Sequence, residues 1–480
     1  MPVRCSRRQF LLGAAALGFA GWAGVRAVRA DLPAEAAVLK AAPTTFPLDP
    51  PGPPEVFGAW GYNGRVPGPT LRFKQGERLH VMLENALPDA TSIHWHGIRL
   101  PNAMDGVPHL TQPPVEPGAR FEYEFDLPDA GTFWYHPHLN ASEQLGRGLL
   151  GALIIDEPEP YPAERDLLWL LDDWRLDAHD EIADDFNSRH DVSHAGRIGD
   201  LVTINGKLPH VIDVRPGERI RLRLLNAANA RNFALHFGGL PVHVIALDGQ
   251  PVEPHEPQDG LVVLGAGMRV DVVLDCVAEA GSYVDVFDDF YRGREYPLMG
   301  LRITGEPLPT AAPGVPPALP PNPLAEPDLA NAVRHELLFE GGMRGSLPRE
   351  TMMPMLMQGK AWTVNGDVIA EHDHAHHSAH PPLFTLARNS TCHLTLRNDT
   401  QWYHPIHLHG HHFRVLTRDG QPEPHQPWRD TVLMAPMETV EIAFVADNPG
   451  DWMLHCHVLE HHAGGMGGVF HVTRDEVCSA

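Results

Sequence analysis

The chain has 480 residues, of which 43% are hydrophobic and 20% are charged, and its formal net charge at pH 7 is −24. This length exceeds what one hydrophobic core supports, and typical domain sizes predict about three domains. The acidic balance argues against nucleic acid as a partner, because a negatively charged surface is repelled by the phosphate backbone.

The first 30 residues have the features of a twin-arginine export signal. Arg7 and Arg8 precede an apolar run that ends at Val25, and Ala30 completes an acceptable cleavage site. A membrane anchor is the alternative, but the run is short and rich in glycine and alanine. We therefore expect passage through the twin-arginine export machinery, no stable membrane insertion after cleavage of residues 1–30, and a periplasmic or exported mature protein.

Three segments share one pattern of alternating apolar residues that ends in asparagine: residues 76–85, 217–226 and 389–398. Such alternation between turn-forming residues predicts β-strands. A second similar strand follows each of them, and an Asn-Gly pair precedes each, at Asn63, Asn205 and Asn365. Three copies of one all-β unit, roughly 140 to 170 residues apart, predict three similar β-sandwiches.

Eight histidines occur as four His-x-His pairs in the first and third copies: His94 and His96, His136 and His138, His407 and His409, and His455 and His457. Residues two apart on a strand share one face, so each pair can present two imidazoles to one metal cluster. The middle copy has Leu235 and Phe237 where the first and third copies have a pair. The eight imidazoles can therefore converge only if the first and third copies face each other.

The segment from His455 to Met466 has the spacing of a blue-copper site, which takes one cysteine, two histidines and a weakly bound axial methionine. Cys456, His461 and Met466 supply three of these four ligands within one short loop. Because His455 and His457 flank Cys456, they point to the opposite face of the strand. Copper chemistry is therefore expected on both sides of this strand.

Together these motifs resemble those of the three-domain multicopper oxidases, the group of bacterial laccases and cuprous oxidases. The resemblance covers almost the whole mature chain and implies an all-β fold of three cupredoxin-like Greek-key β-sandwich domains. The implied division is a signal peptide at 1–30, domain 1 at 31–158, a copper-free domain 2 at 159–306, a proline-rich linker at 307–335 and domain 3 at 336–480.

The same resemblance implies four copper ions as the cofactor, with twelve ligands. A type 1 copper would be bound by His404, Cys456, His461 and axial Met466. His94 and His407 would hold a type 2 copper. One type 3 copper would take His96, His136 and His457, and the other would take His138, His409 and His455.

The implied activity is one-electron oxidation of a reductant at type 1 copper, coupled to four-electron reduction of O2 to water at the other three coppers. Cys456 adjoins His455 and His457 in sequence and so gives electrons a short covalent route. The reductant is a phenol or aromatic amine, or Cu(I) in a periplasmic cuprous oxidase dedicated to copper tolerance. A non-enzymatic cupredoxin scaffold and a two-domain nitrite reductase are further alternatives, disfavoured by the twelve ligand positions and the three repeats.

Two residues next to the ligands are expected to serve proton transfer. Asp105 follows His94 at the spacing where related oxidases carry an acidic group beside the cluster, and an ordinary Asp-Gly turn is the alternative. His462 stands where many bacterial relatives have glutamate directly after the type 1 histidine. An imidazole can relay protons, but it titrates in a different pH range from a carboxylate.

Two segments of the third copy bear on the electron donor. Residues 352–357 hold four methionines whose thioethers favour Cu(I), although core packing explains them equally well. The run from His372 to His380 lies in an insertion relative to the middle copy and can collect divalent metal or form a solvated loop. Aromatic donors need neither segment and would approach His461 directly.

Four cysteines follow the signal: Cys276, Cys392, Cys456 and Cys478. If Cys456 binds copper, at most one disulfide can form among the other three. The sequence leaves its pairing open.

Overall fold

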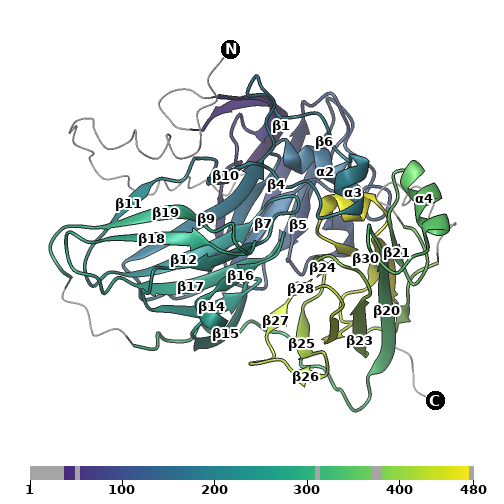
Figure 1. Ribbon diagram of the computed structural model, residues 1–480. Coiled ribbons are helices and arrows are strands. Elements are labelled where there is room, and N and C mark those ends of the chain that lie inside the picture. The colour runs from purple at the N-terminus through teal and green to yellow at the C-terminus, as the bar shows by residue number, and fades with distance from the viewer. Residues whose placement is uncertain (1–36, 49–54, 309–313, 370–380, 475–480) are drawn as a thin grey trace. The chain divides into compact units, whose positions relative to one another are not determined.

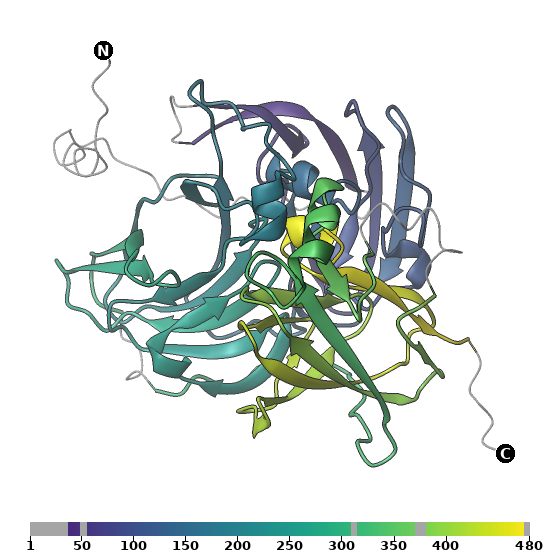
Figure 2. The ribbon, with the colours of Figure 1, turned by 45° about the vertical axis from the view of Figure 1, so that its right-hand side comes forward.

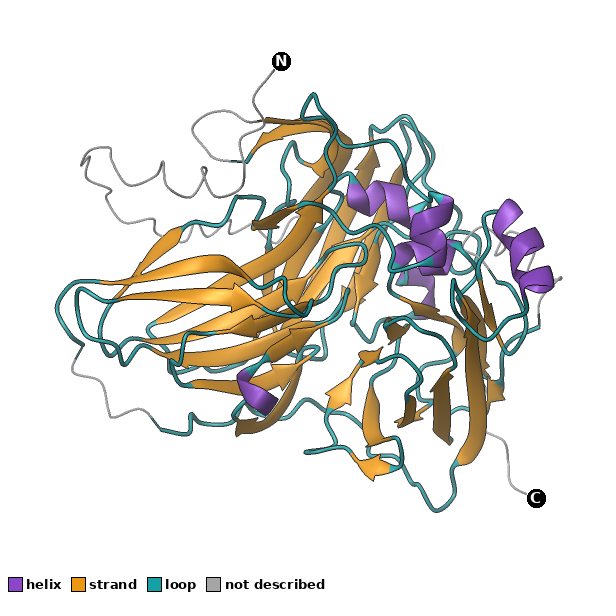
Figure 3. Cartoon of the chain, in the orientation of Figure 1, coloured by secondary structure: helices purple, strands orange, loops and turns teal. Residues whose placement is uncertain are grey.

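The computed structural model describes residues 37–48, 55–308, 314–369 and 381–474. The predicted signal peptide, the run from His372 to His380 and Cys478 lie outside these residues. Strands dominate the described part of the chain, as the sequence predicts (Figures 1 and 3). None of the helices in this part combines the length and apolar character that crossing a lipid bilayer requires.

The strands of the first copy, with their bounds, are β1 (Ala37–Pro47), β2 (Glu55–Tyr62), β3 (Leu71–Lys74), β4 (Arg78–Asn85), β5 (His94–His96), β6 (Arg120–Asp126), β7 (Gly131–His136) and β8 (Gly151–Asp156). Its described residues form one sheet of order β2-β1-β4-β6 and another of order β3-β8-β7-β5. Helices η1 (Asn102–Met104) and α2 (Ala141–Gly146) lie in the connections. Burial alternates along β4, so Leu79, Val81 and Leu83 enter the core.

The middle copy comprises β9 (Arg165–Trp174), β10 (Leu201–Ile204), β11 (Val211–Val214), β12 (Arg219–Asn226), β13 (Phe233–His236), β14 (Val242–Leu247), β15 (Gln250–His255), β16 (Val262–Leu264), β17 (Arg269–Asp275), β18 (Tyr283–Asp288) and β19 (Tyr296–Ile303). One sheet has the order β10-β9-β12-β17-β14-β15 and another the order β11-β19-β18-β13-β16. Helices α3 (Arg189–Ser193) and η2 (Gln258–Gly260) belong to this copy.

The third copy comprises β20 (Val333–Gly341), β21 (Trp362–Val364), β22 (Thr385–Leu386), β23 (Thr391–Asn398), β24 (His404–Leu408), β25 (Phe413–Arg418), β26 (Gln421–Pro422), β27 (Trp428–Arg429), β28 (Thr431–Met434), β29 (Thr439–Val445), β30 (Gly450–Cys456) and β31 (Gly467–Val472), with helices α4 (Arg349–Met357) and α5 (Leu459–Ala463). The sheet β22-β31-β30-β24-β28 includes β24 and β30, which carry several of the predicted metal ligands, and β21-β20-β23-β29-β25-β26 is the other sheet of its described residues. Strand β20 begins at Val333, within the last residues of the predicted linker 307–335.

The three copies of the sequence repeat share the same pattern of strand pairing. Strands β4, β12 and β23 each run parallel to the first strand of their copy and antiparallel to β6, β17 and β29 respectively. Each ends in an asparagine whose side-chain oxygen accepts a hydrogen bond from the backbone two residues later, at Leu87, Ala228 and Thr400. This local turn explains why all three strands end in the same residue type.

The Asn-Gly pairs form the turns that the sequence predicts. Asn63, Asn205 and Asn365 have φ values of 55°, 53° and 54°, and each is followed by a glycine that also has positive φ. Asparagine and glycine tolerate this conformation at low cost. Each asparagine side chain also accepts a hydrogen bond from the first strand of its copy, at Lys40, Leu170 and Leu338.

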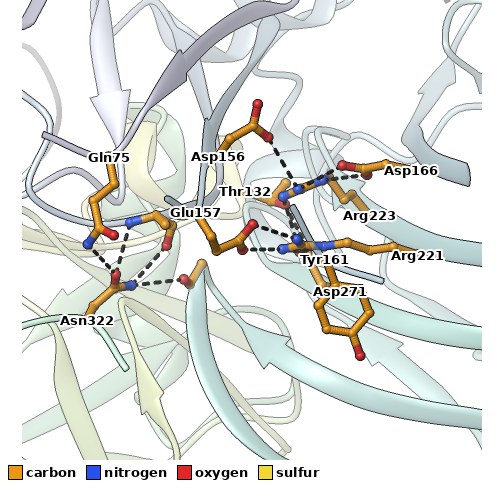
Figure 4. A network of polar contacts seen from close by, with 12 residues as sticks. Gln75, Thr132, Asp156, Glu157, Tyr161, Asp166, Arg221, Arg223, Asp271 and Asn322 are labelled. Carbon is orange, nitrogen blue, oxygen red and sulfur yellow. Dashed lines mark hydrogen bonds and ion pairs between the residues drawn. The ribbon is translucent and has the colours of Figure 1, made fainter. Parts of the chain in front are cut away.

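Strand β12 is buried on both faces because the first copy covers its polar side. Leu222 and Leu224 enter the core of the middle copy, whereas Arg221 and Arg223 point toward the first copy (Figure 4). Arg221 binds both oxygens of Glu157, at 2.8 and 2.7 Å. Arg223 donates to the Thr132 hydroxyl at 3.0 Å, and Thr132 lies on β7, the strand that ends at His136.

Candidate metal centre

Neighbouring strands of one sheet in the first copy, and of one sheet in the third copy, deliver the paired histidines. His94 of β5 lies opposite His136 of β7, and His407 of β24 lies opposite His455 of β30. The two copies meet at this point: the ring centroids are 3.9 Å apart for His94 and His409 and 3.8 Å apart for His96 and His407. All eight histidines are buried. The structure therefore gathers them where the repeat register predicts.

Several sets of ring nitrogens at this contact are close enough to share one ion. Ligand atoms within 4.8 Å of one another occur in the sets His94, His407 and His409; His94, His96 and His136; and His138, His409 and His455. The last set is one of the predicted type 3 sets. In the other predicted type 3 set, the ring centroids of His96, His136 and His457 are 5.0 to 5.8 Å apart.

Backbone carbonyls determine which ring nitrogens face the centre. The Nδ1–H groups of four rings donate to carbonyl oxygens: His94 to Asp105, His136 to Pro137, His407 to Asp430, and His455 to Cys456, at 2.8 to 3.0 Å. A carbonyl oxygen can only accept, so the Nε2 atom of each ring carries a lone pair. In His94, His136 and His407 this buried Nε2 has no partner among the described residues.

Two of the resulting lone pairs, on His409 and His455, face each other. His409 donates from Nδ1 to the carboxylate of Asp105 at 2.9 Å, so its Nε2 also carries a lone pair. This Nε2 lies 3.1 Å from the Nε2 of His455, which lies 3.4 Å from that of His138. Burial lowers the pKa of His409 and His455, which disfavours a proton between them. A bound cation fits this arrangement.

The predicted type 1 ligands form a separate buried group. The Cys456 Sγ atom lies 3.5 Å from Nδ1 of His404 and 3.6 Å from Nδ1 of His461, and the two nitrogens are 3.1 Å apart. Metal–nitrogen and metal–sulfur bonds of about 2.0 and 2.3 Å around one ion give separations of this size. Met466 is fully buried, its backbone N–H donates to the carbonyl of His461, and its carbonyl accepts from Cys456.

Hydrogen bonds also orient both type 1 imidazoles. The Thr400 hydroxyl donates to Asn398, so it must accept from Nε2 of His404 at 2.8 Å. Nε2 of His461 donates to a backbone carbonyl at 2.7 Å. Both Nδ1 atoms therefore aim lone pairs at the Cys456 sulfur, and burial lowers the pKa of His461 to about 3. Burial raises the pKa of the Cys456 thiol, so a bound cation is what would hold it as a thiolate.

The two predicted proton-transfer residues both contact the cluster. Asp105 ends η1 and is followed by Gly106 with φ of 80°, so the turn interpretation also holds. Its carboxylate binds His409 and lies 3.2 Å from Nδ1 of His94. His462 is buried, and its ring stacks on His455 at a centroid distance of 4.4 Å.

Sequence reasoning missed a buried ion pair that supports the same histidines. The Asp430 carboxylate accepts from Nε2 of His96 at 3.1 Å, which leaves Nδ1 of His96 without a partner in the described structure. Arg269 of the middle copy donates to both oxygens of Asp430, at 2.8 and 2.5 Å. Burial alone would raise the pKa of Asp430, but Arg269 holds it well below its usual range. No local spacing marks this pair, because its members lie far apart in sequence.

The structure divides the methionine segment. Met352 is buried in the core, whereas Met353 and Met357 lie one turn apart on α4 and are 40% and 64% exposed. The four thioethers therefore do not share one face. Cys276 and Cys392 are buried free thiols, so they do not pair with each other.

The expectation that aromatic donors approach His461 directly is wrong. His461 is 1% exposed, and its Nε2–H group is covered by the backbone carbonyl of His194 at 2.7 Å. His194 follows α3 of the middle copy, and α3 contacts α5, the helix that carries His461 (Figures 1 and 2). The sequence could not show this contact, because it joins segments of different copies.

Comparisons with known proteins agree with this geometry. Models of the multicopper oxidase family match residues 54–160, 165–297 and 347–476. The multicopper oxidase MmcO of Mycobacterium tuberculosis is 31% identical over a match that covers 96% of each chain. Laccase-1 of Botryotinia fuckeliana is 29% identical, and the match covers 84% of this chain and 77% of the laccase.

Solved structures give the same result. The multi-copper oxidase from Pseudomonas thermotolerans superposes with a TM-score of 0.79 and 36% identity, covering 91% of this chain and 98% of the other. Multicopper oxidases use four copper ions of types 1, 2 and 3 and couple substrate oxidation to O2 reduction. The predictions of cupredoxin-like domains, a copper cofactor and an O2-dependent oxidoreductase are thereby confirmed. The chain belongs to the multicopper oxidase family.

Proposed function

We propose that this multicopper oxidase is laccase-like and takes single electrons from phenols or aromatic amines through a type 1 site of His404, Cys456, His461 and Met466. The observation that carries the ligand assignment is the buried thiol facing two imidazole lone pairs, a donor set that copper fits. An aromatic donor is supported by the Botryotinia laccases. It is also supported by a laccase-like enzyme from Ochrobactrum, 25% identical, described as having oxidase activity towards lignin model compounds.

The other ligand sets belong to the same proposal. The type 2 set is His94 and His407, and the type 3 sets are His96, His136 and His457, and His138, His409 and His455. When bound, copper supplies the one-electron chemistry that no side chain here can perform. The chain's own part is to fix the tautomers, exclude water from buried rings, and bring protons through Asp105 and His462.

We also propose that residues 1–30 direct export through the twin-arginine machinery to the periplasm or beyond. The support is the Arg7-Arg8 pair ahead of a short apolar run. The proposed domains are 31–158, 159–306 and 336–480, with a linker at 307–335 whose end overlaps the start of β20 at Val333.

Copper analysis combined with O2 uptake tests the proposal. The purified protein should hold about four coppers per chain and consume one O2 for every four molecules of 2,6-dimethoxyphenol oxidised. Release of hydrogen peroxide, or absence of O2 uptake by protein with full copper content, would contradict it.

A cuprous oxidase is the second candidate, and the exposed thioethers of Met353 and Met357 favour it. A metallo-oxidase from Campylobacter jejuni, 25% identical with a TM-score of 0.74, is a structural relative. The double variant Met353→Leu/Met357→Leu should leave phenol and Cu(I) oxidation rates unchanged if the laccase-like proposal is correct. Met437→Leu, at another exposed methionine, is the matched control. Selective loss of Cu(I) oxidation in the double variant would establish the second candidate, and deletion of residues 371–380 tests the histidine-rich run in the same assay.

A further inference from the structure

Three consecutive carbonyls of the middle copy are fixed to the third copy around the type 1 ligands. The Val192 oxygen accepts from the indole N–H of Trp362 at 2.6 Å. The Ser193 oxygen accepts from the Met343 backbone at 2.7 Å. The His194 oxygen accepts from Nε2 of His461 at 2.7 Å. The segment from Val192 to His194 therefore lies directly over the type 1 site.

The His194 side chain of this segment belongs to a group of aromatic rings. The His194 ring stacks on His190 at a centroid distance of 4.3 Å and an interplanar angle of 10°. It also meets Trp402 edge-to-face at 5.3 Å. The His190 side chain is 77% exposed, and His194 and Trp402 are half-buried. We call these three residues the aromatic patch.

Neighbouring rings extend the aromatic surface. Tyr403 is 41% exposed and meets Phe290 at 5.1 Å. The positive charge of Arg344 and the negative charge of Asp191 both act on His194, so charge alone does not make this surface a cation site. Uncharged aromatic molecules stack on such rings, because ring pairs attract one another in addition to the apolar area that they bury.

We propose that the aromatic patch of His190, His194 and Trp402 is where phenolic donors dock, and that electrons reach His461 through the backbone of His194. This inference rests on the laccase-like function proposed above. A docked phenol loses one electron into this path and its hydroxyl proton to water, and leaves as a phenoxyl radical. The final acceptor is O2, which takes four electrons and four protons from four such events and becomes two waters.

The test uses the copper-loaded enzyme and the double variant His194→Ala/Trp402→Leu. This variant removes two rings but keeps the residue-194 carbonyl over His461. The control is His255→Ala, which breaks another stacked histidine pair, His255 and His425, with centroids 4.1 Å apart. Measurements are the KM for 2,6-dimethoxyphenol, the anaerobic rate of bleaching of the blue absorption by this phenol, and the type 1 reduction potential by spectroelectrochemical titration.

The double variant should raise KM and slow bleaching roughly five-fold or more, because two ring contacts are lost. Its reduction potential should equal that of the wild type, and the control should match the wild type throughout. The single variant His194→Phe keeps a ring at position 194 and also keeps Trp402. Its bleaching rate should therefore be close to that of the wild type.

Unchanged KM and bleaching in the double variant would overturn the proposal. A slower rate that follows a changed reduction potential would also overturn it, because the effect would then lie in the copper site. Equal slowing with Cu(I) would overturn the aromatic assignment of the patch. If the proposed laccase-like function itself is wrong, the wild-type enzyme will not oxidise the phenol, and this result is distinct from the outcomes above.

Discussion

Cys456 is the residue on which both the proposed type 1 site and the proposed covalent electron route depend. Its buried sulfur faces two imidazole lone pairs, and its neighbours in sequence are His455 and His457 of the cluster. A serine hydroxyl in its place would not ionise to bind copper. We therefore expect Cys456→Ser to lose the intense blue absorption and turnover, while copper content falls from about four to about three per chain. Persistent blue absorption in this variant would refute the assignment of Cys456.

Substitution of Asp105 can separate its hydrogen bonding from its proposed role in proton transfer. Its carboxylate accepts a hydrogen bond from His409 and lies beside His94. Asparagine keeps an oxygen that can accept from His409 but cannot carry a proton as a carboxyl group does. Asp105→Asn should therefore slow reoxidation of the reduced enzyme by O2 by roughly a hundredfold.

The anaerobic reduction of the same variant by a phenol is the internal control and should proceed at the wild-type rate. Stopped-flow absorption separates the two half-reactions. If reoxidation by O2 is as fast as in the wild type across pH, Asp105 is a turn residue that orients His409 and nothing more.

At the scale of elements, the contact between α3 and α5 depends on Gly196, where there is no room for a side chain. Gly196 has φ of 82°, and a Cβ atom there would lie 2.5 Å from both Ala230 Cβ and Val458 Cγ1. Val458 precedes α5, which carries His461. Any side chain at 196 would therefore push the two helices apart and strain the hydrogen bond between His194 and His461.

Gly196→Ala tests this contact, and Gly239→Ala is its matched control. Gly239 has φ of 83°, but a Cβ atom there would meet nothing within 4 Å. Both variants lose roughly 1 kcal/mol of stability because alanine disfavours positive φ. Steric overlap should cost Gly196→Ala about 2 kcal/mol more and alter the blue absorption spectrum. Calorimetry gives the two melting temperatures. If both substitutions lower the melting temperature by the same amount, α3 and α5 separate without a cost in free energy.

At the scale of the whole molecule, the middle copy supplies no predicted copper ligand but holds the other two copies in place. Its Arg269 supports Asp430 beside His96, and its Arg221 and Arg223 bind the first copy (Figure 4). It also supplies the carbonyl that covers His461. A copy without metal ligands can therefore determine both the geometry of the cluster and the access of donors.

The stability of the protein should depend on pH through Asp166, which pairs with Arg223 of the middle copy and with Arg72 of the first. Burial alone would raise the pKa of Asp166, but Arg223, together with Arg221 and Arg72, lowers it to about 2. A carboxyl group whose pKa is lowered on folding stabilises the protein above its unfolded pKa of about 4, and this stabilisation is lost as pH falls toward 2. Asp166→Asn should therefore cost about 2 kcal/mol of stability at pH 6 and roughly half as much at pH 3.

Thermal unfolding at the two pH values checks this prediction. Asp213→Asn is the control, because Asp213 pairs with Arg302 at the surface, where the two side chains are 54% and 60% exposed. Exposed pairs contribute little, so this variant should match the wild type at both pH values. If Asp166→Asn lowers the free energy of unfolding equally at pH 6 and pH 3, the ionised Asp166 carboxylate does not stabilise the protein through these ion pairs.

Local sequence determined the features that depend on residues close together in the chain. Strand β4, its equivalents β12 and β23, and the Asn-Gly turns follow from period-two alternation and from residues that tolerate positive φ. The His-x-His pairs share strand faces for the same geometric reason. The His455 to Met466 loop is short enough that its ligand spacing alone indicates a copper site.

Tertiary structure decided what depends on residues of different copies. The pairing of Arg269 with Asp430, the burial of Met352 and the covering of His461 by His194 each arise where separate segments pack. Alternation and spacing report which face of its own strand a side chain occupies, but not which other copy covers that face. For this reason candidate metal ligands could be read from the sequence, whereas the covering of His461 by His194 required the folded structure.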